Sequence, residues 1–105
     1  MLLVLDVGNS NITLGLYNGD TLEVSWRLET VATRTSDEYG LLVRQLLDDA
    51  GHEPAVVSGV IVASVVPSLT PIVDALARRL FRRPPLVVGP GLRTGMPILY
   101  DPPKD

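Results

Sequence analysis

Runs of apolar residues predict three buried strands. Apolar side chains occupy almost every position of Leu2–Val7 and of the longer run Val56–Val66, and Leu86–Val88 is a shorter run of the same kind. Such runs are typical of strands that are covered on both faces, as they are in a parallel sheet.

Two further segments near the N-terminus show the alternation of half-buried strands. In residues 11–17 apolar side chains alternate with small or polar ones, and residues 21–28 continue the pattern. Between the two segments, Asn18-Gly19 favours a hairpin with a type I′ turn, which needs positive φ at both central residues. The first three strands are therefore expected to form an antiparallel meander.

Two segments have helical periodicity. Thr35, followed three residues later by Glu38, predicts a capping box at the start of the first helix, and Gly51 predicts its end. The second helix is expected to have Ser68 or Thr70 as its N-cap. The apolar stripes of the two helices are Tyr39, Leu42, Val43, Leu46, Leu47 and Ala50, and Ile72, Val73, Leu76, Ala77 and Leu80.

The order of these elements predicts the fold class. It is βββαβαβ, an α/β order in which an antiparallel meander leads into right-handed crossovers. This is the ribonuclease-H-like order, a mixed sheet with helices on its faces. One more helix would be needed to cover the sheet, and it would have to lie beyond Asp105. We expect residues 1–105 to form a single domain.

Composition narrows the class of protein. The chain has 105 residues, 46% of them hydrophobic, which indicates a globular domain and excludes disorder. Its net charge of −3 gives no reason to expect nucleic acid as a partner. The lack of cysteine excludes disulfides and thiolate chemistry and suits a reducing compartment. The apolar run at the N-terminus is too short for a signal peptide or a membrane span, so a cytoplasmic protein without a membrane partner is expected.

Several residues that often carry chemistry have a simpler interpretation here. Arginines crowd the end of the second helix, where cations are favourable to the helix dipole, so a solvated face is expected and not a nucleic-acid site. His52 has no second histidine or cysteine near it and is not expected to bind a metal. Trp26 is expected to be a core residue.

The turn after the first strand is the candidate functional site. Gly8 allows the backbone to approach a ligand closely, and backbone N–H groups in such a turn can bind phosphate oxygens. Asp6 is an acceptor, so its expected role beside phosphate is to hold Mg²⁺, directly or through water. Asn9, Ser10, Asn11 and Thr13 would assist. A simple polar hairpin turn explains most of the same residues and remains an alternative.

Five segments, in order along the chain, form a recognisable set: Asp6–Ser10, Thr33–Tyr39, Ala63–Pro67, Gly89–Gly95 and Tyr100–Pro103. Together they resemble the type III pantothenate kinases of the acetate kinase/sugar kinase/Hsp70/actin superfamily. Members of that family are similar to two actin-like ATPase half-units, so this chain resembles an N-terminal half that stops before its last helix and the second domain.

The resemblance implies ATP-dependent phosphorylation of pantothenate, the first step of coenzyme A biosynthesis. It implies Mg²⁺ and a monovalent cation, K⁺ or NH₄⁺, as cofactors, and a homodimer when the protein is full length. The implied ATP-binding residues are Asp6, Val7, Gly8, Asn9, Ser10, Asn11, Ile12 and Thr13, with Asp6 at the metal and Tyr100 lining the pantothenate pocket.

The resemblance places no catalytic residue in this chain. The family's catalytic base belongs to a Gly-Ala-Asp-Arg motif that would begin just after Asp105. Residues 1–105 alone are therefore expected to be inactive, because phosphoryl transfer depends on positioning and charge stabilisation from both halves. Two other interpretations remain open: a non-catalytic homologue that acts as a regulatory or accessory protein, and a different superfamily kinase or phosphatase with the same phosphate loop.

Overall fold

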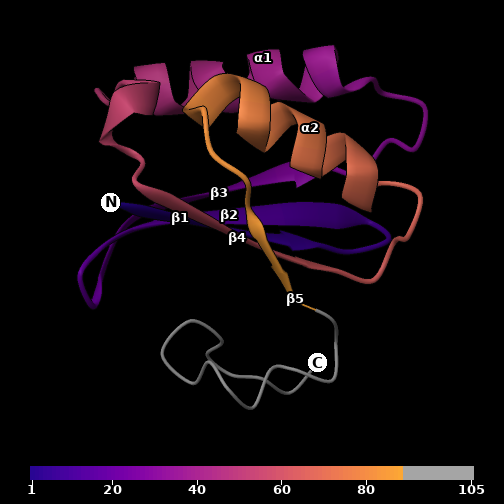
Figure 1. The fold of residues 1–105 in the computed structure, drawn as a ribbon, viewed down its shortest axis with the longest axis horizontal. Coiled ribbons are helices and arrows are strands. Elements are labelled where there is room, and N and C mark those ends of the chain that lie inside the picture. Colours follow the sequence, from indigo (N-terminus) through magenta and orange to yellow (C-terminus); the bar gives the residue numbers. More distant parts are fainter. Residues whose placement is uncertain (89–105) are drawn as a thin grey trace.

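The computed structural model describes residues 1–88, which form a five-stranded mixed sheet with two helices (Figure 1). The sheet order is β3-β2-β1-β4-β5. The elements in chain order are β1 (Leu2–Val7), β2 (Asn11–Asn18), β3 (Thr21–Glu29), α1 (Ser36–Asp49), a 3₁₀ turn (Pro54–Val56), β4 (Gly59–Ser64), α2 (Thr70–Phe81) and β5 (Leu86–Val88).

The predicted βββαβαβ order is confirmed. β1 pairs antiparallel with β2, and β2 pairs antiparallel with β3, so these strands form the expected meander. β4 pairs in parallel with β1 and with β5. Val56–Val66 was predicted as one strand, but β4 covers only its middle, Gly59–Ser64. Val56 is the last residue of the 3₁₀ turn, and the chain leaves the strand after Ser64.

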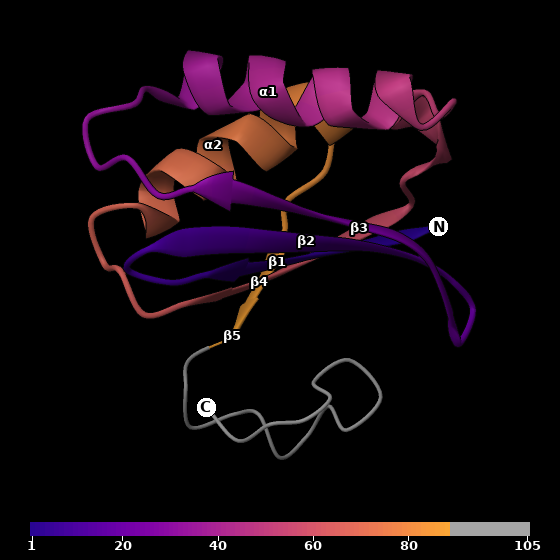
Figure 2. The ribbon, with the colours of Figure 1, turned by 180° about the vertical axis from the view of Figure 1, so that it is seen from behind.

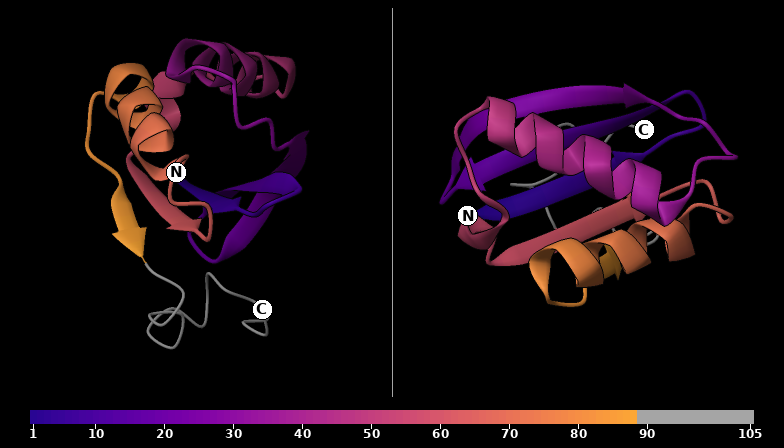
Figure 3. Two further views of the ribbon diagram at one scale, coloured as in Figure 1. Left: turned by 90° about the vertical axis from the view of Figure 1, so that its right-hand side faces the viewer. Right: turned by 90° about the horizontal axis from the view of Figure 1, so that it is seen from above.

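Both helices lie on the same face of the sheet, as the side view and the end-on view show (Figures 2 and 3). The main core lies between them and the sheet, where β1 contributes Leu3, Leu5 and Val7. On the opposite face a small second cluster contains Ile61, Ala63 and Val88, with Leu2 and Val4 packed against it. Within residues 1–88, neither helix covers this cluster.

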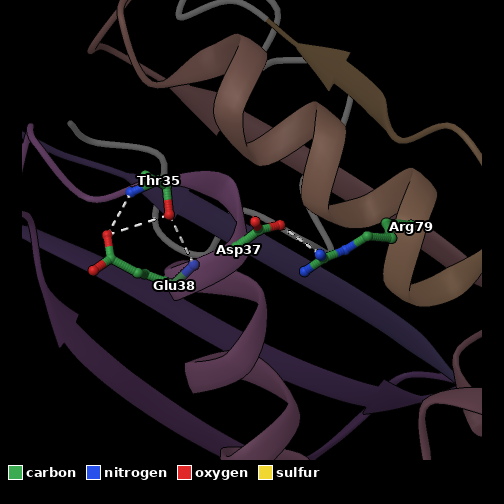
Figure 4. Close-up of polar contacts among 4 residues, drawn as sticks. All are labelled: Thr35, Asp37, Glu38 and Arg79. Carbon is green, nitrogen blue, oxygen red and sulfur yellow. Dashed lines mark hydrogen bonds and ion pairs between the residues drawn. The ribbon is translucent and has the colours of Figure 1, made fainter.

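Helix α1 begins and ends as its sequence predicts. The Thr35 hydroxyl accepts from the backbone N–H of Glu38, and the Glu38 carboxylate accepts from the backbone N–H of Thr35 at 2.8 Å, which is a complete capping box (Figure 4). At the other end Gly51 has φ of +84°, while the N–H groups of Gly51 and His52 donate to the carbonyls of Asp48 and Leu47. This is a Schellman motif, which requires a residue that tolerates positive φ.

The predicted cap of α2 is wrong. The N-cap residue is Leu69, and no side chain caps the helix. Leu69 is fully buried, and its N–H donates to the carbonyl of Val66 at 2.9 Å. The Thr70 hydroxyl also turns back towards that carbonyl. Burial of the Leu69 side chain therefore sets where the helix starts, in place of a side-chain cap.

The predicted turn type of the β2–β3 hairpin is also wrong. Asn18 pairs with Thr21, so the two central residues of the turn are Gly19 and Asp20, and of these only Gly19 has positive φ, at +64°. The register shifts between Leu16 and Tyr17, which indicates a bulge in the ladder. The hairpin itself is confirmed, but its turn lies one residue later than the type I′ pattern requires.

Candidate functional site

The candidate site is the turn Gly8–Ser10, which joins β1 to β2 at one end of the sheet. The backbone N–H of Gly8 donates to the carbonyl of Asn11 at 2.9 Å and closes the turn. Asn9 and Ser10 are exposed at its tip. A short, tight turn directly after a buried strand therefore presents its backbone to solvent.

Asp6 lies two residues before this turn, on the face of the sheet that the helices do not cover. It pairs with Thr13 on β2 and with Ala63 on β4, and both Asp6 and Thr13 are exposed. Arg27 of β3 pairs with Thr13 and continues the same row across the sheet. Paired residues of neighbouring strands point to the same face. A carboxylate, a hydroxyl and a guanidinium are thus aligned on one face beside the turn.

Two neighbouring segments hold the turn in place through its carbonyl groups. Thr30, the first residue after β3, donates from its hydroxyl to the Gly8 carbonyl at 2.8 Å and from its backbone N–H to the Ser10 carbonyl at 2.9 Å. From the other side, the N–H of Val65 donates to the carbonyl of Val7 at 3.0 Å. Two carbonyls of the turn, and that of the strand residue just before it, are therefore bonded to residues that follow β3 and β4.

The backbone N–H groups at the tip of the turn, unlike the carbonyls just described, are not bonded to other described residues. Within residues 1–88, the structure shows no acceptor for the backbone N–H of Asn9 or of Ser10. Consecutive backbone N–H groups in a turn form an anion-binding concavity. With the carbonyls of Gly8 and Ser10 bonded to Thr30 and the N–H groups of Asn9 and Ser10 at an exposed tip, the turn is suited to receive phosphate oxygens.

Gly8 has a structural role of its own. A Cβ added at this position would lie 3.1 Å from the Asn11 carbonyl oxygen, which is the acceptor of the turn's own hydrogen bond. The sequence suggested that glycine permits close approach of a ligand. The structure adds that a side chain at this position would crowd the closed turn.

The structure brings most of the predicted ATP-binding residues together, but two of their side chains point elsewhere. Val7 and Ile12 are buried in the main core, so only their main-chain atoms are available at the turn. Tyr100 lies outside the described residues. Sequence reasoning missed Thr30 and Arg27, since the register that brings β3 beside the turn is not visible in their local sequence.

The donor set at Asp6 fits a magnesium ion that is shared with a phosphate ligand. Within residues 1–88, no group of three or more His, Cys, Asp or Glu side chains converges on one point. Mg²⁺ in nucleotide sites is commonly held by one or two carboxylates together with phosphate oxygens and water, and it does not need a cage of protein ligands.

Two other features lie away from the turn. A hollow of about 480 Å³ between β3 and α1 is lined by Leu28, Leu42, Gln45, Leu46, Asp48 and Asp49. Three arginines at or just after the end of α2 have protein partners: Arg78 pairs with Asp74, Arg79 pairs with Asp37, and Arg83 donates to the Ser58 carbonyl. The Arg79–Asp37 pair joins α2 to the first turn of α1 (Figure 4).

No helix in the described part of the chain is both long enough and apolar enough to span a bilayer.

Solved structures identify the fold. The chain superposes on the putative N-acetylglucosamine kinase from Porphyromonas gingivalis with a TM-score of 0.65 at 14% identity, covering 89% of this chain and 36% of that one. The ROK hexokinase from Thermus thermophilus matches with a TM-score of 0.59, also at 14% identity, covering 85% and 35%. The protein therefore has the half-unit of the actin-like ATPase fold that such kinases share.

The sequence comparisons identify the family. Residues 2–105 match the type III pantothenate kinase family. Over all 105 residues the chain is 56% identical to a type III pantothenate kinase of Anaeromyxobacter sp. (strain K) and 51% identical to that of Myxococcus xanthus (strain DK1622). The chain belongs to the type III pantothenate kinase family. It spans 41% of the length of these curated relatives.

Proposed function

We propose that the full-length protein containing this chain transfers a phosphoryl group from ATP to pantothenate, forming 4′-phosphopantothenate in the first step of coenzyme A biosynthesis. The observation that carries the proposal is the family match over residues 2–105, with 50–56% identity to relatives that are named type III pantothenate kinase. The relatives reported above carry a kinase name, and none of them is named as an accessory factor.

In this reaction the described residues would act on the nucleotide. The open N–H groups of Asn9 and Ser10 would bind phosphate oxygens, with the side chains of Asn9, Ser10, Asn11 and Thr13 as further donors. Asp6 would hold Mg²⁺, directly or through water. A magnesium ion bound there would neutralise negative charge on the phosphate oxygens. The chain's contribution is therefore to orient and stabilise the phosphates.

The proposal is tested with full-length protein, ATP, Mg²⁺ and pantothenate, by following 4′-phosphopantothenate by mass spectrometry and ADP release by a coupled assay. Product that depends on pantothenate is expected. Asp6→Asn should reduce turnover by roughly a hundredfold or more, as the loss of a transition-state electrostatic contact does. Asp20→Asn is the matched control, since Asp20 is an exposed aspartate in the β2–β3 turn.

Two outcomes would count against the proposal. Folded full-length protein that binds ATP without phosphorylating pantothenate would favour the non-catalytic alternative. Unchanged turnover in a correctly folded Asp6→Asn variant would remove Asp6 from the metal site while leaving the overall activity in place.

We further propose that the enzyme requires K⁺ or NH₄⁺, acts as a homodimer in the cytoplasm and has no nucleic-acid partner. The cation and the dimer are what the resemblance of the sequence segments implies. The lack of cysteine and the net charge of −3 support the compartment and the absence of nucleic acid. Turnover in K⁺, NH₄⁺ and Na⁺ buffers of equal ionic strength tests the first requirement, and light scattering of full-length protein tests the second.

A further inference from the structure

We propose that Thr30 is a positioning residue for the nucleotide site: it fixes the backbone of the turn Gly8–Ser10 so that the tip N–H groups point towards phosphate. Thr30 itself would not touch the nucleotide. The inference rests on the proposed role of this turn in binding ATP and assigns that role a supporting residue from the β3–α1 connection.

The first step is the pair of hydrogen bonds from one residue. The Thr30 hydroxyl donates to the Gly8 carbonyl at 2.8 Å, and the Thr30 backbone N–H donates to the Ser10 carbonyl at 2.9 Å. Gly8 and Ser10 are the first and last residues of the turn. A single side chain and its own main chain therefore hold both ends of the turn against the end of β3.

The second step follows from peptide geometry. A trans peptide is planar, so its C=O and the following N–H point in opposite directions. The Gly8 carbonyl shares its peptide plane with the N–H of Asn9. When the Thr30 hydroxyl holds that carbonyl, it also directs the Asn9 N–H away from Thr30. This N–H is one of the two tip donors for which the described residues provide no acceptor.

The third step is that Thr30 is itself held firmly. The Tyr39 hydroxyl accepts from the N–H of Val31 at 2.9 Å and donates to its carbonyl at 2.9 Å. Tyr39 is buried in the first turns of α1. Arg34 lies over the Tyr39 ring, 5.3 Å from its centroid, and donates to the Glu29 carbonyl at 3.2 Å. The residue after Thr30 is therefore bonded to a core tyrosine, and the residue before it is held by Arg34.

The test uses full-length protein and the variants Thr30→Val and Thr30→Ser. Valine keeps the branched shape but lacks the hydroxyl, whereas serine keeps the donor. The affinity for a non-hydrolysable ATP analogue with Mg²⁺ is measured by calorimetry, together with KM for ATP and for pantothenate. Thr33→Val is the matched control, because Thr33 is an exposed threonine of the same connection with no side-chain hydrogen bond in the described structure.

We expect the loss of the Thr30 hydroxyl to change KM for ATP much more than KM for pantothenate. Thr30→Val should weaken analogue binding and raise KM for ATP about fivefold to tenfold, the size expected for one lost hydrogen bond. KM for pantothenate should stay within about twofold, since Thr30 holds the turn that is assigned to the nucleotide. Thr30→Ser should restore nucleotide binding, and Thr33→Val should resemble wild type. Thr30→Ala, which also removes the hydroxyl, replaces the valine variant if that variant does not fold, and it should weaken analogue binding in the same way.

The outcomes separate this inference from the proposed function. If the wild type does not phosphorylate pantothenate but Thr30→Val still binds the analogue more weakly than the wild type, the proposed function is overturned and the positioning role is kept. An active wild type whose Thr30→Val variant binds the analogue normally would overturn the positioning role alone. Equal losses for ATP and pantothenate together with a lower Tm would show a merely structural residue and would also overturn it.

Discussion

Among single residues, Gly8 and Gly15 of the β1–β2 hairpin differ in what a methyl group would meet. At Gly8 a Cβ would lie 3.1 Å from the Asn11 carbonyl oxygen, which is fixed because it accepts the Gly8 N–H. At Gly15 the neighbours at 3.2 Å are the far ends of the Leu22 and Tyr17 side chains, which can move.

Gly8→Ala should therefore lower the free energy of unfolding by about 1–3 kcal/mol, the usual cost of forced crowding, and weaken nucleotide binding because the turn must shift. Gly15→Ala is the control and should be neutral or stabilise slightly, since alanine loses less backbone entropy than glycine on folding. Urea unfolding and nucleotide titration of both full-length variants measure the difference. Equal stability of the two variants would contradict the crowding argument.

Tyr100 is predicted to contact pantothenate and not ATP. A phenol can pack on an apolar part of a substrate while its hydroxyl forms a hydrogen bond with a polar part. In the full-length enzyme Tyr100→Ala should raise KM for pantothenate much more than KM for ATP. Steady-state kinetics with each substrate varied in turn measure both constants, and the reverse pattern would assign Tyr100 to the nucleotide site.

At the scale of elements, the start of α1 depends on its capping box, which can be tested directly. Thr35→Ala removes the hydroxyl that accepts from the Glu38 N–H and should lower the free energy of unfolding by about 1 kcal/mol. Thr33→Ala, in the same connection, removes an exposed hydroxyl that forms no hydrogen bond in the described structure and should change stability little. Thermal unfolding of the two variants side by side would show the difference, and similar Tm values would contradict the role of the cap.

Elements whose signals are local were predictable from the sequence. The capping box Thr35/Glu38 and the closing Gly51 are each defined by neighbours within a few residues, and both are present. The cap of α2 was not predictable, because burial of Leu69 against the sheet prevails over the capping propensity of the polar residues beside it.

In the candidate site, too, some features are set by local sequence and others by tertiary packing. The turn Gly8–Ser10 and Asp6 are recognisable from residue type alone. The hydrogen bonds from Thr30 to the turn depend on the β2–β3 register, which brings Thr30 into contact with Gly8, 22 positions earlier in the chain. Such register is set by the bulge and by the packing of the entire sheet. Sequence reasoning could therefore find the turn but not the residues that hold it.

For the whole molecule, the main feature is that the sheet carries both described helices on one face (Figure 3). On the other face, apolar residues of β1, β4 and β5 form the second cluster around Ile61, Ala63 and Val88. Leu86 pairs with Ile61 and so points to this face, where it is 60% exposed. We propose that a further helix and the second domain cover this face in the full-length protein, given that the chain spans 41% of its relatives.

Residues 1–105 expressed alone should therefore be inactive and should self-associate or bind a hydrophobic dye, because uncovered apolar patches behave as interfaces. Leu86→Glu should reduce both dye fluorescence and self-association by charging that face. Leu41→Glu is the matched control: Leu41 is 59% exposed, but it lies on α1 and so on the opposite side of the molecule. Affinity for ATP with Mg²⁺ should be no better than about millimolar, since few donors remain to offset the cost of association. Sedimentation measures the self-association, and dye titration the exposed apolar surface, of residues 1–105 and of the two glutamate variants. A monodisperse 1–105 monomer that phosphorylates pantothenate would overturn the prediction, and equal effects of the two glutamate variants would show that the β5 face is not the surface responsible.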